Sequence, residues 1–349
     1  MAGVVSVAIV GATGYAGVEA LRLLAGHPQA RVTYLASHSQ AGQTIGHVYP
    51  HLADSGELRL QPVEPEAIAA AAEVALLSLP ARQSLELAPQ LVGRGVRVVD
   101  FGADYRLRDA ATYARYYGGA HTAADLLAQA VYGLTEFDRP AIAGARLVAN
   151  PGCYPTAALF ALRPAVAAGA VACDDLIVDA KSGVTGAGRS LTQSTQFAEA
   201  DDNVWPYKLA GEHRHTPEIE QELARAAGGP VGVTFSPHQV PMARGLLATC
   251  YARLLHPWTT AEALACYRAA YGGEPFIQVL GEGLPSTKAT LGTNCVQVAV
   301  RVDERLRRLV AVAAIDNLGK GAAGQAVQNV NCMFGLQETA GLPRIGLLP

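Results

Sequence analysis

The sequence predicts an α/β protein with two domains: the first is built on a mainly parallel sheet, and the second is an α+β domain with an antiparallel-rich sheet. Three observations support this fold class. Short β-branched segments alternate with helical segments up to about residue 150, and longer strands separated by turns follow them. The 349 residues are also enough to build two hydrophobic cores.

The first domain is expected to begin with a strand over 4–10, a β-branched run that ends at Gly11. A helix over 14–25 follows and stops at Gly26-His27-Pro28. Further strands are predicted over 31–37, 75–79, 96–100 and 146–149, with a helix over 84–92. Strand–helix alternation at this spacing requires right-handed crossovers, so these strands should run parallel.

The second domain is expected to open with a helix over 156–168. Its strands are predicted over 176–181, 231–240, 245–255, 295–302 and 308–315, with a helix over 261–271. The stretch "CVQVAVRVDERLRRLVAVAAID" predicts an antiparallel hairpin that turns at Asp303–Glu304. A last helix is predicted over 321–334.

The composition excludes several classes of partner. With 16% charged residues and a net charge of −3, nothing indicates nucleic acid or an anionic membrane as a partner. The apolar N-terminus lacks a basic region and a cleavage site, and no stretch reaches the roughly 20 apolar residues of a membrane helix. The six cysteines lack C-x-x-C spacing, so we expect no metal site, reduced thiols and a cytoplasmic location. All except Cys153 are expected to be buried filler.

A glycine-rich loop, "GATGYAG", follows the first strand and precedes a helix. In this context a tight turn brings backbone N–H groups to a pyrophosphate, which predicts a Rossmann-type dinucleotide-binding domain. The loop after the second strand carries Ser37 and Ser39, where an NAD enzyme carries a carboxylate, so we expect NADP(H) as the cofactor. The expected cofactor contacts in this domain are Gly11, Thr13, Gly14, Tyr15, Ala16, Gly17, Ser37, Ser39 and Pro80.

The stretch "NPGCYPTAA" places Cys153 between a strand end and a helix start. The helix dipole there contributes only about 0.3–1 kcal/mol, less than one pKa unit, so a nucleophilic thiol needs a basic partner as well. The candidates are His213 and His215 in "YKLAGEHRHTPEIE", and their spacing does not choose between them. The alternative is that this segment is only a polar helix cap on the surface.

Five stretches, "GATGYAG", "NPGCYPTAA", "SGVTGAGR", "AGEHRHTPEI" and "DNLGKGAAGQAVQN", together resemble the N-acetyl-γ-glutamyl-phosphate reductase family of arginine biosynthesis, related to aspartate-semialdehyde dehydrogenase. The resemblance implies reduction of N-acetyl-L-glutamyl 5-phosphate by NADPH to N-acetyl-L-glutamate 5-semialdehyde and phosphate. It also implies a first domain of 1–150 plus 320–349, an inserted domain of 151–319, and a homodimer or homotetramer.

The resemblance assigns roles to individual residues. It implies Cys153 as the nucleophile that forms a thioester, His213 as the acid/base residue, and Asn317, Ser182 and Gly183 as cofactor contacts. A substrate with several negative charges also needs cations, and Arg106, Arg189 and Arg214 are the candidates, each of which could equally form a surface salt bridge.

Three other functions are consistent with parts of the sequence. A carrier-protein-linked aminoadipyl-phosphate reductase of lysine biosynthesis shares the chemistry, although a docking face for a carrier is not evident. A non-catalytic dinucleotide sensor would not need both Cys153 and His213. A cysteine acyltransferase or protease would not need the glycine loop at 11–17.

Overall fold

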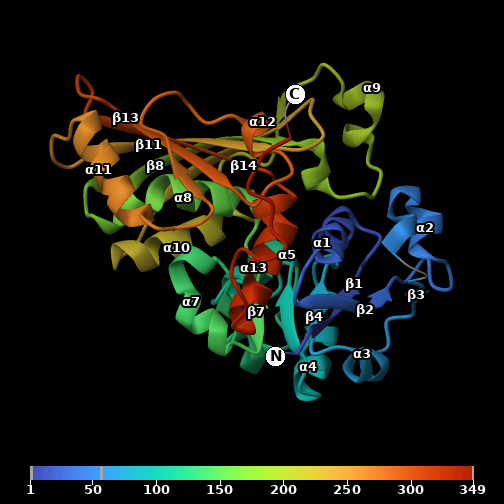
Figure 1. Ribbon diagram of the computed structural model, residues 1–349. Helices are drawn as coiled ribbons and strands as arrows, with labels where there is room; N and C mark the ends of the chain where they lie inside the picture. The colour runs from blue at the N-terminus through green and yellow to red at the C-terminus, as the bar shows by residue number, and fades with distance from the viewer. Residues whose placement is uncertain (1–2, 56–57, 348–349) are drawn as a thin grey trace. The chain divides into compact units, whose positions relative to one another are not determined.

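The computed structural model describes residues 3–55 and 58–347, which form two compact units (Figure 1). The first unit runs to Pro151 and includes Ala322–Leu342. The second comprises Gly152–Gly321 and the chain from Pro343 onward. Among the described residues, no helix has both the length and the apolar character needed to cross a membrane.

The first unit is built on a parallel sheet with the strand order β3-β2-β1-β4-β5-β7-β6. Its strands are β1 (Val5–Val10), β2 (Ala30–Ala36), β3 (Leu60–Gln61), β4 (Val74–Leu77), β5 (Arg97–Asp100), β6 (Val131–Tyr132) and β7 (Leu147–Ala149). The parallel sheet predicted from strand–helix alternation is therefore confirmed. The order reverses between β1 and β4, and such switch points are where α/β sheets bind ligands.

Helices connect and cover these strands. They are α1 (Tyr15–Ala25), α2 (Ile45–Val48), the 3₁₀ helix η1 (Pro50–Ser55), α3 (Pro65–Ala71), α4 (Ser84–Gly93), α5 (Ala110–Tyr117), α6 (Ala124–Leu127), α7 (Thr135–Gly144) and α13 (Gly324–Met333). The late helix α13, red in Figure 1, packs against α1 and α7.

Buried amides explain how α13 is held in the first unit. Asn329 Nδ2 donates to the Gly133 carbonyl (2.9 Å) and to Asn150 Oδ1 (3.1 Å). Gln325 Nε2 donates to Thr135 Oγ1 at 2.7 Å, and that hydroxyl donates to Asn329 Oδ1 at 2.8 Å. These buried side chains are joined to one another by hydrogen bonds, and only the Gln325 Oε1 atom among them has no partner in the described part of the chain. The network fixes α13 in one position next to the chain that leads to Cys153.

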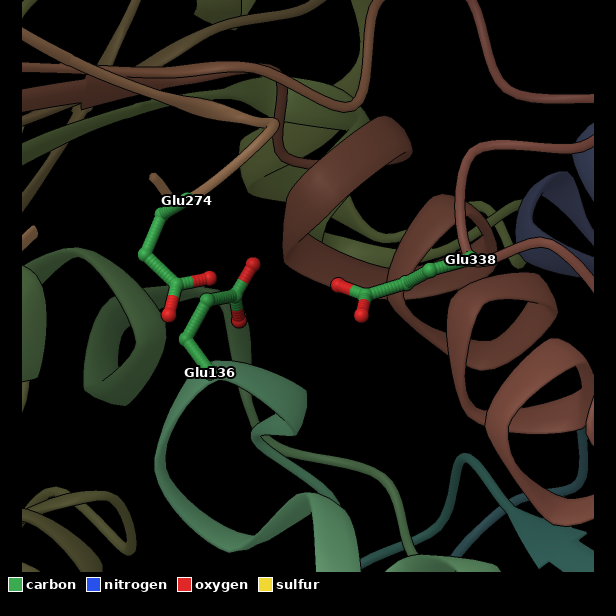
Figure 2. Close-up of side chains that lie close together, drawn as sticks. All are labelled: Glu136, Glu274 and Glu338. Atoms are coloured by element: carbon green, nitrogen blue, oxygen red, sulfur yellow. The ribbon is translucent and has the colours of Figure 1, made fainter. Parts of the chain in front are cut away.

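Carboxylates gather where α7 packs against α13, and Figure 2 shows Glu136 on α7 and Glu338 beyond the end of α13. Gln328 Nε2 donates to both, at 3.0 and 2.7 Å. Arg139 forms an ion pair with Glu338 at 2.7 Å. The third glutamate drawn, Glu274, belongs to the second unit. We therefore interpret Glu136 and Glu338 as part of the packing between α7 and α13.

The second unit contains a mixed sheet with the order β12-β13-β14-β11-β8-β10-β9. Its strands are β8 (Val171–Gly183), β9 (Trp205–Pro206), β10 (Val233–Val240), β11 (Leu246–Leu254), β12 (Ile277–Val279), β13 (Val296–Asp303) and β14 (Arg308–Ile315). Most neighbours are antiparallel, and β8–β10 and β12–β13 are parallel. The predicted hairpin is confirmed, because Asp303 at the end of β13 pairs with Arg308 at the start of β14.

Helices cover one face of this sheet. The central helix α8 (Cys153–Ala167) packs on β8, β11, β13 and β14 and also contacts α10 (Thr216–Ala227) and α11 (Thr260–Tyr271) (Figure 1). The short elements are the 3₁₀ helices η2 (Val184–Ala187) and η3 (Gln193–Thr195), and the helices α9 (Phe197–Ala200) and α12 (Thr287–Thr290). Side chains alternate along the strands, so the sheet's other face carries half-buried residues such as Asp179, Tyr251 and Val312.

Several boundaries differ from the sequence-based expectation. Helix α8 begins at Cys153 itself rather than at 156. The last helix starts as a π-helical turn, Gly319–Ala323, before α13. The segment from Pro343 was expected in the first domain but belongs to the second unit, because Asn294 N donates to the Pro343 carbonyl and Leu347 N to the Leu291 carbonyl, both at 3.0 Å.

The expectation that the cysteines other than Cys153 are buried filler is only partly correct. Cys250 and Cys295 are buried, whereas the remaining three, Cys173, Cys266 and Cys332, are partly exposed. All six cysteines are free thiols.

Candidate active site

Cys153 is the first helical residue of α8, and Gly152 is its N-cap. Gly152 is held from both sides. Its N–H donates to the buried carboxylate of Glu218 at 2.8 Å, and its carbonyl accepts from the Thr156 hydroxyl and the Thr156 N–H, each at 2.9 Å. The backbone that carries the sulfur is therefore fixed between α8 and α10, while the thiol is partly exposed.

A pocket in the second unit contains Cys153 together with three other residues predicted for the site, Ser182, His213 and Arg214. It is completed by seven residues that share this pocket wall: Tyr154, Gly186, Ala187, Tyr207, Lys208, His215 and Gln239. The thiol, an imidazole and two cationic side chains thus line one cavity. This combination suits a nucleophile that acts on an anionic substrate.

His213 is buried among aromatic rings and is only 5% exposed. Its ring centroid lies 5.1 Å from Phe235, 5.4 Å from Tyr207 and 5.7 Å from Tyr154. The alternative that this segment is only a surface cap is therefore wrong for His213. The neighbouring His215 is the partly buried N-cap residue of α10.

The hydrogen bond at Nδ1 fixes the tautomer of His213. Nδ1 accepts from the His215 N–H at 3.0 Å, so in the neutral ring the proton is on Nε2. Burial, followed by the nearby charges of Arg214 and Lys208, lowers the pKa of His213 to about 3. At neutral pH the ring is an uncharged Nε2–H donor.

The turn before His213 is strained. Lys208 and Ala210 adopt left-handed φ values of 47° and 55°, and Gly211 follows at 83°. Non-glycine residues in this region cost on the order of 1–3 kcal/mol each and collect at functional sites. The strained turn sets the exposed Lys208 on the pocket wall, near the exposed Arg214.

Two tyrosines and a glutamine form a wall of the pocket that the sequence did not reveal. Tyr154 donates to the His238 carbonyl at 3.0 Å, and Tyr207 donates to the Tyr154 hydroxyl at 3.1 Å. Burial raises the pKa of both phenols, so both remain protonated donors. The only local signal for Gln239 was its position in the alternation of β10, where it shares the buried face of the strand with Val233, Phe235 and Pro237.

The predicted residues after β8 shape the loop beside the pocket. The Ser182 hydroxyl donates to the Gly183 carbonyl at 3.1 Å, and a Cβ on Gly183 would lie 2.8 Å from the Met242 and Ala243 carbonyl oxygens. Asn317 accepts from the Gly245 N–H at 2.7 Å and donates to Thr185 Oγ1 at 3.0 Å, which ties this loop to the β10–β11 turn.

The other two predicted arginines lie elsewhere. Arg189 is exposed after the loop and does not line the pocket with Cys153. Arg106 is in the first unit, where it is 8% exposed and donates to the carbonyl oxygens of Asn150 (2.8 Å) and Phe101 (2.7 Å). Arg106 therefore braces the chain that leaves β5 and β7, and its contact with substrate stays a prediction.

The glycine loop of the first unit fits a dinucleotide. Gly11 has a φ of 80°, and a Cβ there would lie 2.1 Å from the Ser78 carbonyl oxygen; a Cβ on Gly17 would lie 2.4 Å from the Gly11 carbonyl oxygen. Helix α1 starts after Gly14 with no side-chain cap and no acidic residue in its first turn. Its first N–H groups are thus suited to hold a phosphate.

The remaining predicted cofactor residues surround this helix start or follow neighbouring strands. The Thr13 hydroxyl lies 3.3 Å from that of the buried Ser37, and the Thr13 carbonyl accepts from Tyr49 at 2.8 Å. Tyr15, Ser39 and Pro80 are exposed, whereas Ala16 is half-buried. The chain after β2 reads Ser37, His38 and Ser39, so it carries no carboxylate at these three positions.

Two family models match the chain. Residues 6–145 match the semialdehyde dehydrogenase NAD binding domain, and residues 153–317 match the semialdehyde dehydrogenase dimerisation domain. The N-acetyl-γ-glutamyl-phosphate reductase of Symbiobacterium thermophilum is 49% identical over 343 residues, 98% of each chain. That of Desulforudis audaxviator is 47% identical over 346 residues, 99% of this chain and 100% of the relative.

Solved structures share the fold. Aspartate semialdehyde dehydrogenase II of Vibrio cholerae, complexed with ASA, has a TM-score of 0.73 at 21% identity and covers 95% of this chain and 98% of its own. The aspartate semialdehyde dehydrogenase of Candida albicans with NADP has a TM-score of 0.70 at 18% identity over the same shares. These similarities confirm the predicted two-domain α/β fold.

Proposed function

The chain belongs to the N-acetyl-γ-glutamyl-phosphate reductase family, and from this we propose that it reduces N-acetyl-L-glutamyl 5-phosphate to N-acetyl-L-glutamate 5-semialdehyde with release of phosphate. One observation carries the proposal: Cys153 at the start of α8 shares a pocket with His213, Lys208 and Arg214. A thiol nucleophile, a neutral imidazole donor and two cations match the reacting carbon, the developing oxyanion and the negative charges of such a substrate.

The chemistry divides between two steps on Cys153. Its thiolate attacks the acyl carbon, the C–O bond to phosphate breaks, and a thioester forms as phosphate leaves. The reduced nicotinamide, when bound, supplies a hydride to the thioester carbon. The resulting thiohemiacetal collapses to the aldehyde, and the electron pair of the C–S bond returns to the Cys153 sulfur.

His213 is proposed to act first as a hydrogen-bond donor. With Nδ1 occupied by the His215 N–H, the Nε2–H can stabilise the thiolate and the oxygen of the tetrahedral intermediates. For the ring to accept the thiol proton, the bond between Nδ1 and His215 must break or the tautomer must change. Lys208 and Arg214 are proposed to hold the phosphate or carboxylate of the substrate.

The cofactor is a nicotinamide dinucleotide, and we propose NADP(H) specifically. The Gly11–Gly17 turn and the uncapped start of α1 would hold the pyrophosphate, and Ser37 and Ser39 would lie at the ribose 2′-phosphate. Steady-state rates with NADPH and NADH test this preference. We expect NADPH to be favoured at least tenfold in kcat/KM, and a Ser39→Asp variant to reduce that ratio, because a carboxylate repels the 2′-phosphate.

The chain is a homo-oligomer by its match to the dimerisation domain, and we propose a homodimer or a pair of such dimers. The open face of the second sheet is the proposed interface. Its centre is largely apolar and half-buried, with Leu247, Tyr251, Val310 and Val312 on β11 and β14. Such a face suits a second copy better than solvent.

The reverse reaction tests the proposed function. N-acetyl-L-glutamate 5-semialdehyde should reduce NADP⁺ only when inorganic phosphate is added, because phosphate must release the thioester. Cys153→Ser should lose this activity by at least a thousandfold. Full turnover by Cys153→Ser, or NADP⁺ reduction that does not depend on phosphate, would refute the thioester mechanism. The same assay with a carrier-linked aminoadipate semialdehyde tests the alternative function, the aminoadipyl-phosphate reductase of lysine biosynthesis.

A further inference from the structure

The hydrogen-bond chain along the pocket wall has a fixed direction. The His238 carbonyl can only accept, so the Tyr154 hydroxyl donates to it at 3.0 Å. The Tyr154 oxygen therefore accepts the Tyr207 proton at 3.1 Å, and the Tyr207 oxygen accepts from the Gln239 amide, a bond that opposes the rise of the Tyr207 pKa. An amide that donates to Tyr207 turns its NH₂ toward that phenol and its carbonyl oxygen away from it.

The carbonyl oxygen of Gln239 has no donor in the pocket wall. Gln239 is 6% exposed and lines the pocket with Cys153, and its Oε1 has no hydrogen-bond partner. A buried acceptor with no donor from the protein is costly, so we expect a donor of the ligand to pair with it when the pocket fills.

Strand geometry explains why Gln239 faces the pocket. On β10 it pairs in register with Ser182 of β8, another pocket residue. Its neighbour His238 points to the opposite face of the sheet, where it lines a separate surface pocket with Asp179 and Tyr251. The position of Gln239 is therefore built into the sheet and does not depend on a flexible loop.

The other polar groups of the pocket complement anions. Lys208 and Arg214 carry positive charge, and the neutral His213 ring presents a donor. An acceptor among such groups fits a ligand that is anionic at its ends and has one N–H between them. The proposed substrate has a carboxylate, an acyl phosphate and a single amide N–H.

We propose that Gln239 Oε1 accepts the amide N–H of the N-acetylated substrate and so makes the enzyme specific for the acylated amino acid. This assignment rests on the proposed function. A buried acceptor of this kind discriminates strongly against a substrate that lacks the matching donor, because the acceptor then stays unpaired.

An ester analogue tests the assignment. In 2-acetoxy-5-oxopentanoate an oxygen replaces the N–H of N-acetyl-L-glutamate 5-semialdehyde, and the rest of the molecule is unchanged. With the unmodified enzyme in the phosphate-dependent reverse reaction, we expect kcat/KM to be about tenfold to a hundredfold lower for the ester. Equal values for the two substrates would overturn the proposal without any variant.

The variant Gln239→Met keeps the side-chain length and removes the acceptor. We expect its kcat/KM for the amide to fall to the level of the ester, with little change for the ester. The same substitution at the exposed Gln278 on β12, the strand at the far end of the sheet order from β9 and β10, should change neither value. Circular dichroism and thermal unfolding confirm that both variants fold.

The remaining outcomes separate this inference from the proposed function. If Gln239→Met slows both substrates equally, Gln239 supports the tyrosines and does not recognise the amide. If it raises the KM for NADP⁺ and leaves the amide-to-ester ratio unchanged, its partner is the cofactor. If the unmodified enzyme oxidises neither aldehyde, the proposed function itself fails, and the inference fails with it.

Discussion

At the scale of single residues, His213 combines two properties that favour a neutral ring. It is buried among Phe235, Tyr207 and Tyr154, and its Nδ1 already accepts a backbone proton. A charged imidazolium would lose that bond and would face Arg214 and Lys208. The residue is therefore suited to donate a hydrogen bond from Nε2 to an oxyanion and poorly suited to hold a positive charge.

This environment predicts a pH effect on stability. The pKa of His213 is lowered to about 3 from its ordinary 6.5, so between these values the unfolded chain binds the extra proton. Stability should therefore be lost as pH falls below about 6.5. Between pH 6.5 and 4, the unmodified protein should lose about 2–3 kcal/mol more unfolding free energy than the His213→Gln variant. Urea unfolding at several pH values measures this, with His256→Gln as the control; parallel curves for unmodified enzyme and His213→Gln would contradict it.

Gly321 lies against the nucleophile, because a Cβ added there would stand 2.9 Å from the Cβ of Cys153. We expect Gly321→Ala to displace the cysteine and lower kcat at least tenfold, with a cost of about 1–3 kcal/mol from overpacking. The matched control is Gly229→Ala, where an added Cβ meets nothing within 4 Å. Rates of thiol alkylation and turnover would show the effect, and normal kcat for Gly321→Ala would disprove this contact.

At the scale of elements, a buried hydrogen bond joins α10 to the start of α8. The Glu218 carboxylate in the first turn of α10 accepts from the N–H of Gly152, the N-cap of α8. Because the same α10 segment follows His213, this bond ties the placement of the histidine segment to that of the cysteine.

Removing this bond should affect both stability and turnover. Glu218→Ala leaves the Gly152 N–H without its acceptor, so we expect a loss of about 1–3 kcal/mol in unfolding free energy and a lower kcat. Glu218→Gln keeps an oxygen at Oε1 and should recover much of the stability. Denaturant melts and initial rates of the three proteins provide the comparison. An Ala variant as stable and active as the parent would mean that the bond has no organising role.

Most elements could be predicted from local pattern, and the exceptions share a cause. Strand β14 lies at 308–315 as predicted, because its alternation is local. The start of α8 was missed because no cap is visible near Cys153; the carboxylate that binds its N-cap comes from a residue 66 positions away. Gln239 was missed for a related reason: its position beside Ser182 depends on the register between β8 and β10, which the sequence does not display.

At the scale of the whole molecule, each unit has its own task in the proposed reaction. The first has the parallel sheet and glycine turn suited to a dinucleotide, and the second has the pocket with Cys153 and His213. The second unit also has a sheet on which the described helices α8, α10 and α11 pack. In this sheet the central strands β11 and β14 place Thr249 directly beside Val312.

The uncovered face predicts how the oligomer can be broken. Val312→Arg places a long cation on β14, in a region where Val310 and Tyr251 are apolar neighbours. Burying two such charges across a twofold interface is unfavourable, so we expect a shift toward monomers in light scattering coupled to gel filtration. The control is Ala269→Arg on the exposed side of α11, which covers the sheet's other face and should keep the parent mass. A Val312→Arg protein that stays oligomeric at micromolar concentration would place the interface on another surface.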